Sequence, residues 1–225
     1  MSKGAVLFDI GSTLITGPDI SPSKYIARLL GLPDEGKAQV ADIIMCRDFA
    51  GPGDICRALR QHFEAGPGLE QGVEELWKLQ ENSAREVPGA SAAVQHASNM
   101  GYSLGVVSDI WAPYYNAFEK ACPDIAGLLE CASLSFREGA RKPAAELFLR
   151  ALERLGALPQ ESWMVGDTYK NDLYPAMGLG LKTVWVLCRP EKEYASMAGV
   201  LRGELPRPDI ILDCLGSFTR LNLRG

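Results

Sequence analysis

The sequence predicts an α/β fold in which a parallel sheet carries helices on both faces. From about residue 87 onward, short apolar runs alternate with segments of helical periodicity, which is typical of parallel strands joined by crossover helices. Before that point, a long stretch with only helical periodicity separates the first apolar run from the second. This interruption predicts an inserted all-helical domain at residues 17–86, with residues 1–16 and 87–225 forming the core.

The N-terminal part begins with a predicted buried strand, Ala5 to Ile10, that stops at Gly11. Ser21 then supplies a helix N-cap with proline at the first helical position, and Gly31 ends that helix. Helical signals continue to about residue 86, with no convincing strand among them. Three further apolar stripes indicate helices: Val40, Ile43, Ile44 and Phe49; Ile55, Leu59 and Phe63; and Val73, Leu76, Trp77 and Gln80.

The second half shows the alternation that defines the fold class. Strands are predicted at residues 102–108, 131–134, 162–165, 181–187 and 209–212. Helices are predicted at residues 91–100, 114–120, 146–155 and 171–177. Strands that alternate with helices in this way predict a parallel sheet with right-handed crossovers.

Composition excludes several classes of function. Apolar residues make up 47% of the 225 residues and charged residues 23%, as in ordinary globular proteins. A net charge of −5 argues against a nucleic-acid partner, and no apolar run is long enough for a membrane helix. The N-terminus shows no signal peptide, and the six scattered cysteines indicate reduced thiols in a cytoplasmic protein, expected as a monomer or homodimer. With only two histidines, a histidine-rich metal site or a Ser-His-Asp hydrolase is poorly supported.

Four polar clusters follow predicted strands, where parallel α/β sheets bind their ligands. Each cluster alone also fits an ordinary turn, a helix cap or a solvated cation. Their order along the chain is what raises their weight. The clusters are Asp9-x-Gly11-x-Thr13, Ser108, Arg141-Lys142-Pro143, and the run from Gly166-Asp167 to Asp172.

The order and spacing of these clusters resemble those of the haloacid dehalogenase superfamily. The similarity covers nearly the whole chain and is greatest to the phosphatase-like branch, which has a Rossmann-like core and a mobile helical cap of the C1 type. The resemblance implies a phosphatase that acts on a small phosphorylated metabolite with Mg²⁺ as cofactor. Substrate selection would then belong to the helical insert.

The resemblance also implies a role for each cluster. Asp9 would attack phosphorus and form an aspartyl-phosphate that water hydrolyses. Lys142 and Ser108 would complete the catalytic set and grip the phosphoryl oxygens, and Thr13 would orient the loop in the substrate-binding site. Mg²⁺ prefers hard oxygen ligands. Those implied here are the Asp9 carboxylate, the Gly11 carbonyl and the Asp167 carboxylate, with Asp172 as a further ligand or an anchor.

Gly11 departs from the phosphatase pattern. That branch usually carries a second aspartate at this position, which works as general acid and base, whereas glycine keeps only the carbonyl. General acid catalysis contributes about 10²–10⁴-fold, so hydrolysis of unactivated phosphate esters is expected to be slow. Ser12 is too weak an acid to substitute. Asp109, His62 and Lys37 are the alternatives that the sequence offers.

Rival functions remain open at this stage. Dehalogenases of the superfamily also lack the second aspartate, but they need no metal, so the acidic run ending at Asp172 argues against them. Phosphonate-cleaving relatives use a cap lysine, for which Lys24 and Lys37 are available without a surrounding motif. A catalytically weak protein that binds a phospho-ligand or a partner is a third reading. A receiver-type signalling domain would need only about half this length.

Three side chains of the insert are ambiguous between substrate binding and structure. Arg47 and Arg57 fit either a second anionic group or solvated helix positions, and we favour the latter. Trp77 lies on an apolar helical stripe, so we expect it to pack the insert rather than stack on a ligand.

Overall fold

The computed structural model describes residues 4–18 and 20–223. Its centre is a six-stranded sheet with the order β5-β4-β1-β6-β7-β8, in which every neighbouring pair is parallel. The predicted parallel α/β core is therefore confirmed. The strands are β1 (Ala5–Phe8), β4 (Ser103–Ser108), β5 (Cys131–Leu134), β6 (Trp163–Gly166), β7 (Lys182–Val186) and β8 (Ile210–Leu212).

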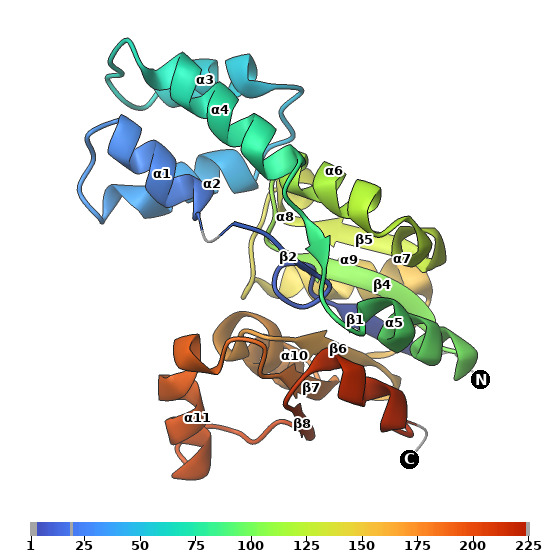
Figure 1. Ribbon diagram of the computed structural model, residues 1–225. Coiled ribbons are helices and arrows are strands. Elements are labelled where there is room, and N and C mark those ends of the chain that lie inside the picture. The colour runs from blue at the N-terminus through green and yellow to red at the C-terminus, as the bar shows by residue number, and fades with distance from the viewer. Residues whose placement is uncertain (1–3, 19, 224–225) are drawn as a thin grey trace.

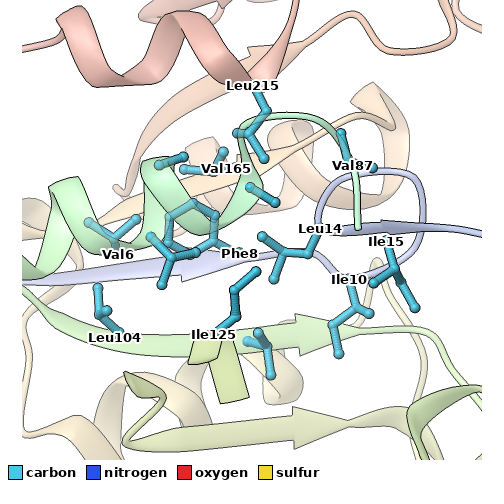
Figure 2. Packing of buried hydrophobic residues seen from close by; sticks show 14 of the residues in the cluster. Val6, Phe8, Ile10, Leu14, Ile15, Val87, Leu104, Ile125, Val165 and Leu215 are labelled. Carbon is cyan, nitrogen blue, oxygen red and sulfur yellow. The ribbon is translucent and has the colours of Figure 1, made fainter. Parts of the chain in front are cut away.

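Helices cover both faces of this sheet. Alternate residues of β1 point to opposite sides: Val6 and Phe8 belong to one buried cluster, and Ala5 and Leu7 to another. The first cluster packs beneath α5 (Ala90–Asn99), α6 (Ala112–Ala121), α7 (Pro123–Leu128) and the 3₁₀ segment η4 (Leu215–Arg220) (Figure 2). The second packs beneath α9 (Ala145–Leu155) and α10 (Tyr174–Gly178). The inner strands β1, β4 and β6 are buried on both faces, as their largely apolar sequences predict.

Four helices form a body of their own between β1 and β4, standing apart from the sheet (Figure 1). They are α1 (Pro22–Leu29), α2 (Gly36–Met45), α3 (Pro52–Arg60) and α4 (Leu69–Glu81). Ser21 caps α1 as predicted, because its Oγ accepts from the Lys24 amide at 3.4 Å. Ile26, Val40, Ile55 and Val73 lie at the centre of the buried cluster of this insert.

The two ends of the insert are joined by a short antiparallel ribbon that the sequence analysis missed. Strand β2 (Ile15–Thr16) pairs with β3 (Arg85–Glu86). No strand was predicted between residues 16 and 86, which was wrong at these ends. Two-residue strands are too short to display the alternation by which strands are recognised.

A tryptophan from the sheet side also enters the insert. Trp111, which follows β4, is 1% exposed and belongs to the apolar cluster of the insert. Its ring meets Trp77 edge-on at 5.8 Å, and its Nε1 donates to Gln80 Oε1 at 3.3 Å. A salt bridge of 3.3 Å between Arg141 and Asp42 adds a second contact. The insert is thus attached to the core by packing as well as by its two connecting segments.

The C-terminal half differs from expectation in local detail. The helix predicted at residues 171–177 is a π-helical turn, η2 (Tyr169–Leu173), that continues into α10. Three short helices were not predicted: α7, α8 (Ser135–Glu138) and α11 (Tyr194–Leu201). Because α8 intervenes after β5, the Arg141-Lys142-Pro143 run lies in the loop before α9 and not directly at a strand end. Helices of four to eight residues carry too little periodicity to be read from one sequence.

Two further expectations concern the cysteines and the absence of membrane helices. All six cysteines are free thiols. Within the described part of the chain, no helix has the length and apolar character needed to cross a bilayer.

Candidate active site

The topology brings three of the four polar clusters to one edge of the sheet. Strand β1 lies between β4 and β6. Because the three strands are parallel, their carboxyl ends lie side by side. Asp9 directly follows β1, Ser108 ends β4, and Asp167 directly follows β6. The sequence separation of more than 150 residues between Asp9 and Asp167 is closed by strand pairing alone.

Lys142 joins this edge from the loop before α9 and forms the centre of a buried ion network. Its Nζ lies 2.6 Å from Asp9 Oδ1 and 2.6 Å from Asp172 Oδ1, and it also donates to the Val107 carbonyl at 3.2 Å. Asp9, Lys142 and Asp172 are all 7% exposed or less. Burial alone would lower the pKa of Lys142, but the carboxylates of Asp172 and Asp9 outweigh it and raise that pKa. Lys142 therefore stays charged at neutral pH.

Two hydroxyls fix the carboxylate of Asp9. Ser108 Oγ donates to Asp9 Oδ1 at 3.0 Å, and Thr13 Oγ1 lies 3.4 Å from Asp9 Oδ2. Both residues are almost completely buried. They are not among the described residues that line the adjoining cavity. The structure thus places every residue predicted for the nucleophile cluster within hydrogen-bond distance of Asp9 or in its loop.

Asp167 has a cationic partner that the sequence analysis did not identify. Arg189 Nε and Nη2 lie 2.9 Å and 2.5 Å from Asp167 Oδ2, while Thr168 Oγ1 donates to Oδ1 at 3.3 Å. The Trp185 indole N–H donates to the Asp167 main-chain carbonyl at 3.0 Å. Arg189 comes three residues after β7, so the rule that ligands bind at strand carboxyl ends would have pointed to it.

The oxygens of three buried carboxylates converge. Each of Asp9, Asp167 and Asp172 offers an oxygen within 4.8 Å of the other two. Burial, followed by the charge of Asp9, raises the pKa of Asp167. Burial raises the pKa of Asp172 despite Lys142, because Asp9 and Asp167 add to the effect. Such a raised pKa marks a site where negative charge is incompletely compensated.

A small cavity of about 220 Å³ lies against these carboxylates. Its charged lining consists of four aspartates and two cations, an excess of two negative charges when all are ionised. Clustered hard oxygen donors with excess negative charge fit a divalent cation such as Mg²⁺. The lining residues are Asp9, Gly11, Ser12, Asp109, Lys142, Asp167, Thr168, Asn171, Asp172 and Arg189.

A second cavity, of about 520 Å³, opens between the sheet edge and the insert. The core contributes Ile110, Trp111 and Tyr114, and the insert contributes Met45 and Gln80, among others. Its volume is within the range of small-molecule sites. Residues of the insert and of the core line this cavity together.

The loop that follows Asp9 is open towards both cavities. A Cβ atom built on Gly11 meets nothing within 4 Å. Ser12 has a φ of 65°, a left-handed conformation that is uncommon for a residue with a side chain and that tends to occur at functional sites. Gly11 and Ser12 line both cavities. Gly11 therefore adds no side chain to the boundary that the two cavities share.

The structure separates the residues suggested as replacements for the missing acid. Asp109 lines both cavities, and its Oδ1 accepts from the Lys142 amide at 2.8 Å. Burial raises the pKa of Asp109. His62 and Lys37 are exposed on the insert, and neither lines either cavity. Of the three suggested replacements, only Asp109 lies at the site.

The structure also shows where the ambiguous residues of the insert lie. Arg47 and Arg57 are exposed and absent from the lining of both cavities, and Arg57 pairs with Asp54 on the same helix. Trp77 is 9% exposed and packs within the insert. Lys24 is exposed and lines neither cavity, so the geometry gives no support to a lysine-dependent phosphonate cleavage.

Comparison with known proteins decides the family. The sequence model described as haloacid dehalogenase-like hydrolase matches residues 17–186. The chain belongs to this family. The matched range contains Ser108, Lys142, Asp167 and Asp172 and begins after the Asp9–Thr13 loop, where the sequence departs from the phosphatase pattern.

Several curated proteins are similar in sequence. A glyceraldehyde 3-phosphate phosphatase of Pyrococcus furiosus is 32% identical over 55% of the chain and 52% of its own length. A ribulose-1,5-bisphosphate 5-phosphatase of Halopiger xanaduensis is 27% identical over 96% of the chain and 98% of its own length. The chain spans about half the length of the first of these relatives and nearly all of the second.

Solved structures share the fold at lower identity. CbbY from Rhodobacter sphaeroides, crystallised with phosphate, superposes with a TM-score of 0.62 at 19% identity, covering 97% of this chain and 100% of that chain. A HAD phosphatase from Thermococcus onnurineus gives a TM-score of 0.59 at 22% identity, covering 96% of both chains. These likenesses extend the shared fold across the insert as well as the sheet.

Proposed function

We propose that this protein is a Mg²⁺-dependent phosphatase that acts on a small phosphorylated metabolite through an aspartyl-phosphate. One observation carries the proposal: a buried aspartate at the end of the central strand faces a lysine and two further carboxylates beside a small cavity that shares lining residues with a larger one. The relatives support the same class of reaction, since the two described above are a glyceraldehyde 3-phosphate phosphatase and a ribulose-1,5-bisphosphate 5-phosphatase.

In this proposal Asp9 is the nucleophile. An Asp9 carboxylate oxygen attacks phosphorus, the bond to the leaving-group oxygen breaks, and the leaving group departs with the electron pair. Water then attacks phosphorus and releases inorganic phosphate and free Asp9. Ser108 and Thr13 hold the carboxylate, and the Lys142 ammonium, 2.6 Å from Asp9, lies where it would contact a phosphoryl oxygen.

The metal would be held by oxygens of Asp9 and Asp167 together with the Gly11 carbonyl. When bound, Mg²⁺ would offset the negative charge of the carboxylates and of the phosphoryl oxygens. Asp172 is the least direct of the predicted ligands, because its Oδ1 accepts from Lys142 at 2.6 Å and its Oδ2 from the Thr168 amide at 3.0 Å. We assign it the anchoring of Lys142.

The helical insert, residues 17–86, would act as the cap that selects the substrate. It supplies one wall of the larger cavity, including Pro18, Ile20, Met45 and Gln80. Phosphate would bind in the small cavity beside Asp9, and the remainder of the substrate would extend through the opening at Gly11 into the larger one.

A catalytically weak phospho-ligand or partner-binding protein is the second candidate, and Gly11 is the observation that favours it. Without a carboxylate there, the proton for an alkoxide leaving group has to come from elsewhere, and Asp109 is the nearest suggested source. The retained Asp9, Lys142 and Asp167 would bind a phosphate group with or without turnover. Measured turnover separates the two candidates.

Mg²⁺ should stabilise the folded protein if the carboxylates form its site. A ligand that binds only the folded state at 100 times its Kd adds about 2.7 kcal/mol, so we expect a rise of several degrees in Tm in saturating Mg²⁺. Asp167→Asn should remove that rise, and Asp213→Asn, a change of an exposed aspartate outside the site, should keep it. Scanning calorimetry with and without Mg²⁺ measures both. An equal rise in wild type and Asp167→Asn would rule out the proposed metal site.

A further inference from the structure

Arg189 is the charged residue that the proposed reaction leaves without a role. It follows β7 and contacts Asp167 Oδ2 through Nε at 2.9 Å and Nη2 at 2.5 Å. These contacts go to one oxygen and involve two of the five N–H groups of the guanidinium. The other three are not committed to Asp167. About a third of the side chain, 35%, is exposed.

The exposed part of Arg189 faces the route that a substrate would take. Four described residues line both cavities: Gly11, Ser12, Asp109 and Arg189. Arg189 is the cation among these four. A phosphorylated molecule with its phosphoryl group beside Asp9 and its remainder in the larger cavity would pass this guanidinium close to the scissile bond.

The larger cavity is also lined by apolar and aromatic residues. Its core wall is apolar or aromatic at Ile110, Trp111 and Tyr114. Burial, with a further contribution from Asp9 that Arg189 partly offsets, raises the pKa of Tyr114 to about 12, so its hydroxyl stays neutral. Further charges, Glu191 and Lys192, follow Arg189 in sequence on the same wall. Among the described residues that line this cavity, Arg189 and Lys192 are the cations, and of the two only Arg189 also lines the small cavity beside Asp9.

We propose that Arg189 recognises a second anionic group of the substrate, a carboxylate or another phosphate a few bonds from the scissile phosphoryl group. The planar guanidinium pairs with either group through two parallel hydrogen bonds, which a neutral substituent does not offer. The proposal rests on the phosphatase function above and names the class of molecule that the site would prefer.

The contact with Asp167 allows a second role for Arg189, the positioning of Asp167. The test has to distinguish this role from substrate binding. If Arg189 only positions Asp167, its removal alters the metal site and slows every substrate alike. If Arg189 binds the substrate, its removal raises KM only for substrates that carry the second anion. The selectivity between matched substrates, together with the Mg²⁺ concentration for half-maximal rate, therefore distinguishes the two roles.

The first arm measures hydrolysis of 2-phosphoglycolate, ethane-1,2-diol bisphosphate and ethyl phosphate in saturating Mg²⁺. The three share a primary phosphate ester and differ in the second group: carboxylate, phosphate or methyl. We expect at least one anionic substrate to show a KM roughly 10- to 100-fold below that of ethyl phosphate, the range for hydrogen bonds to charged groups. Arg189→Gln should abolish that difference, and Arg189→Lys should restore part of it. The variant Arg202→Gln, which removes an exposed arginine paired with Glu204, should match wild type.

The second arm measures binding without turnover. Calorimetric titration of Asp9→Asn with the same compounds and Mg²⁺ should show the same preference, lost in Asp9→Asn combined with Arg189→Gln. Selective binding without hydrolysis in wild type would uphold the role of Arg189 and overturn the phosphatase function. Hydrolysis with equal KM values for all three compounds would overturn the role of Arg189 and leave the function standing. An equal loss of activity toward all three compounds in Arg189→Gln, with a higher Mg²⁺ concentration for half-maximal rate, would also overturn the role of Arg189.

Discussion

Lys142→Met is expected to lower the free energy of unfolding by about 3–5 kcal/mol, the usual cost of removing one partner from a buried ion network. Lys142 is 7% exposed and lies 2.6 Å from both Asp9 and Asp172. Methionine fills similar volume but leaves two buried carboxylates without their counter-charge. Urea denaturation without added Mg²⁺ measures the change.

Lys78→Met is the matched control for that experiment. Lys78 forms an exposed ion pair with Glu74 on α4, at 2.7 Å. Exposed pairs of this kind are screened by water and contribute little to stability, so the same substitution should have little effect there. Similar losses in both variants would mean that the Lys142 network is screened much as a surface pair is, contrary to its burial. Lys142→Met should also abolish turnover, because it removes the cation beside Asp9, the proposed nucleophile.

Gly11→Asp is expected to raise the rate of hydrolysis of phosphate esters with poor leaving groups by up to about 10²–10⁴-fold, the contribution of a general acid. The structure can accept the side chain, since a Cβ at Gly11 meets nothing within 4 Å. An alkoxide needs a proton as it leaves, whereas p-nitrophenolate hardly does. Wild type should therefore prefer p-nitrophenyl phosphate to ethyl phosphate in kcat/KM, and the preference should shrink in Gly11→Asp.

Gly11→Asn controls for the added bulk, because it matches the aspartate in size and cannot donate a carboxylic proton. If wild type hydrolyses both esters equally well, another group already supplies the proton. Asp109, which lines the small cavity, is then the first candidate. Loss of activity in both variants would show that the substrate itself occupies the open space at Gly11.

The sequence was sufficient for the fold class and for the residues that the parallel strands bring together at one edge of the sheet. Buried parallel strands produce continuous apolar runs, and a run such as Ala5 to Phe8 is recognisable alone. Asp9, Ser108 and Asp167 were predictable because each lies at or next to a strand end. Lys142 was found through its resemblance to a known pattern, since α8 separates it from β5.

Arg189 and Trp111 show what the sequence does not provide. A lone arginine after a strand carries no pattern, and its pairing with Asp167 depends on how the loop after β7 folds back towards β6. Trp111 follows a core strand, yet it packs in the insert against Trp77. Contacts between separate bodies have no periodicity, so only the folded structure reveals them.

The phosphorylation of Asp9 tests the central proposal most directly. The missing aspartate at Gly11 would also have activated water for the second step, so the aspartyl-phosphate should accumulate during turnover of p-nitrophenyl phosphate with Mg²⁺. Acid quenching followed by peptide mass spectrometry should find phosphate on Asp9 in wild type, and Asp9→Asn should carry none and release no p-nitrophenolate. Unchanged turnover in Asp9→Asn, or phosphate attached elsewhere, would contradict the proposal.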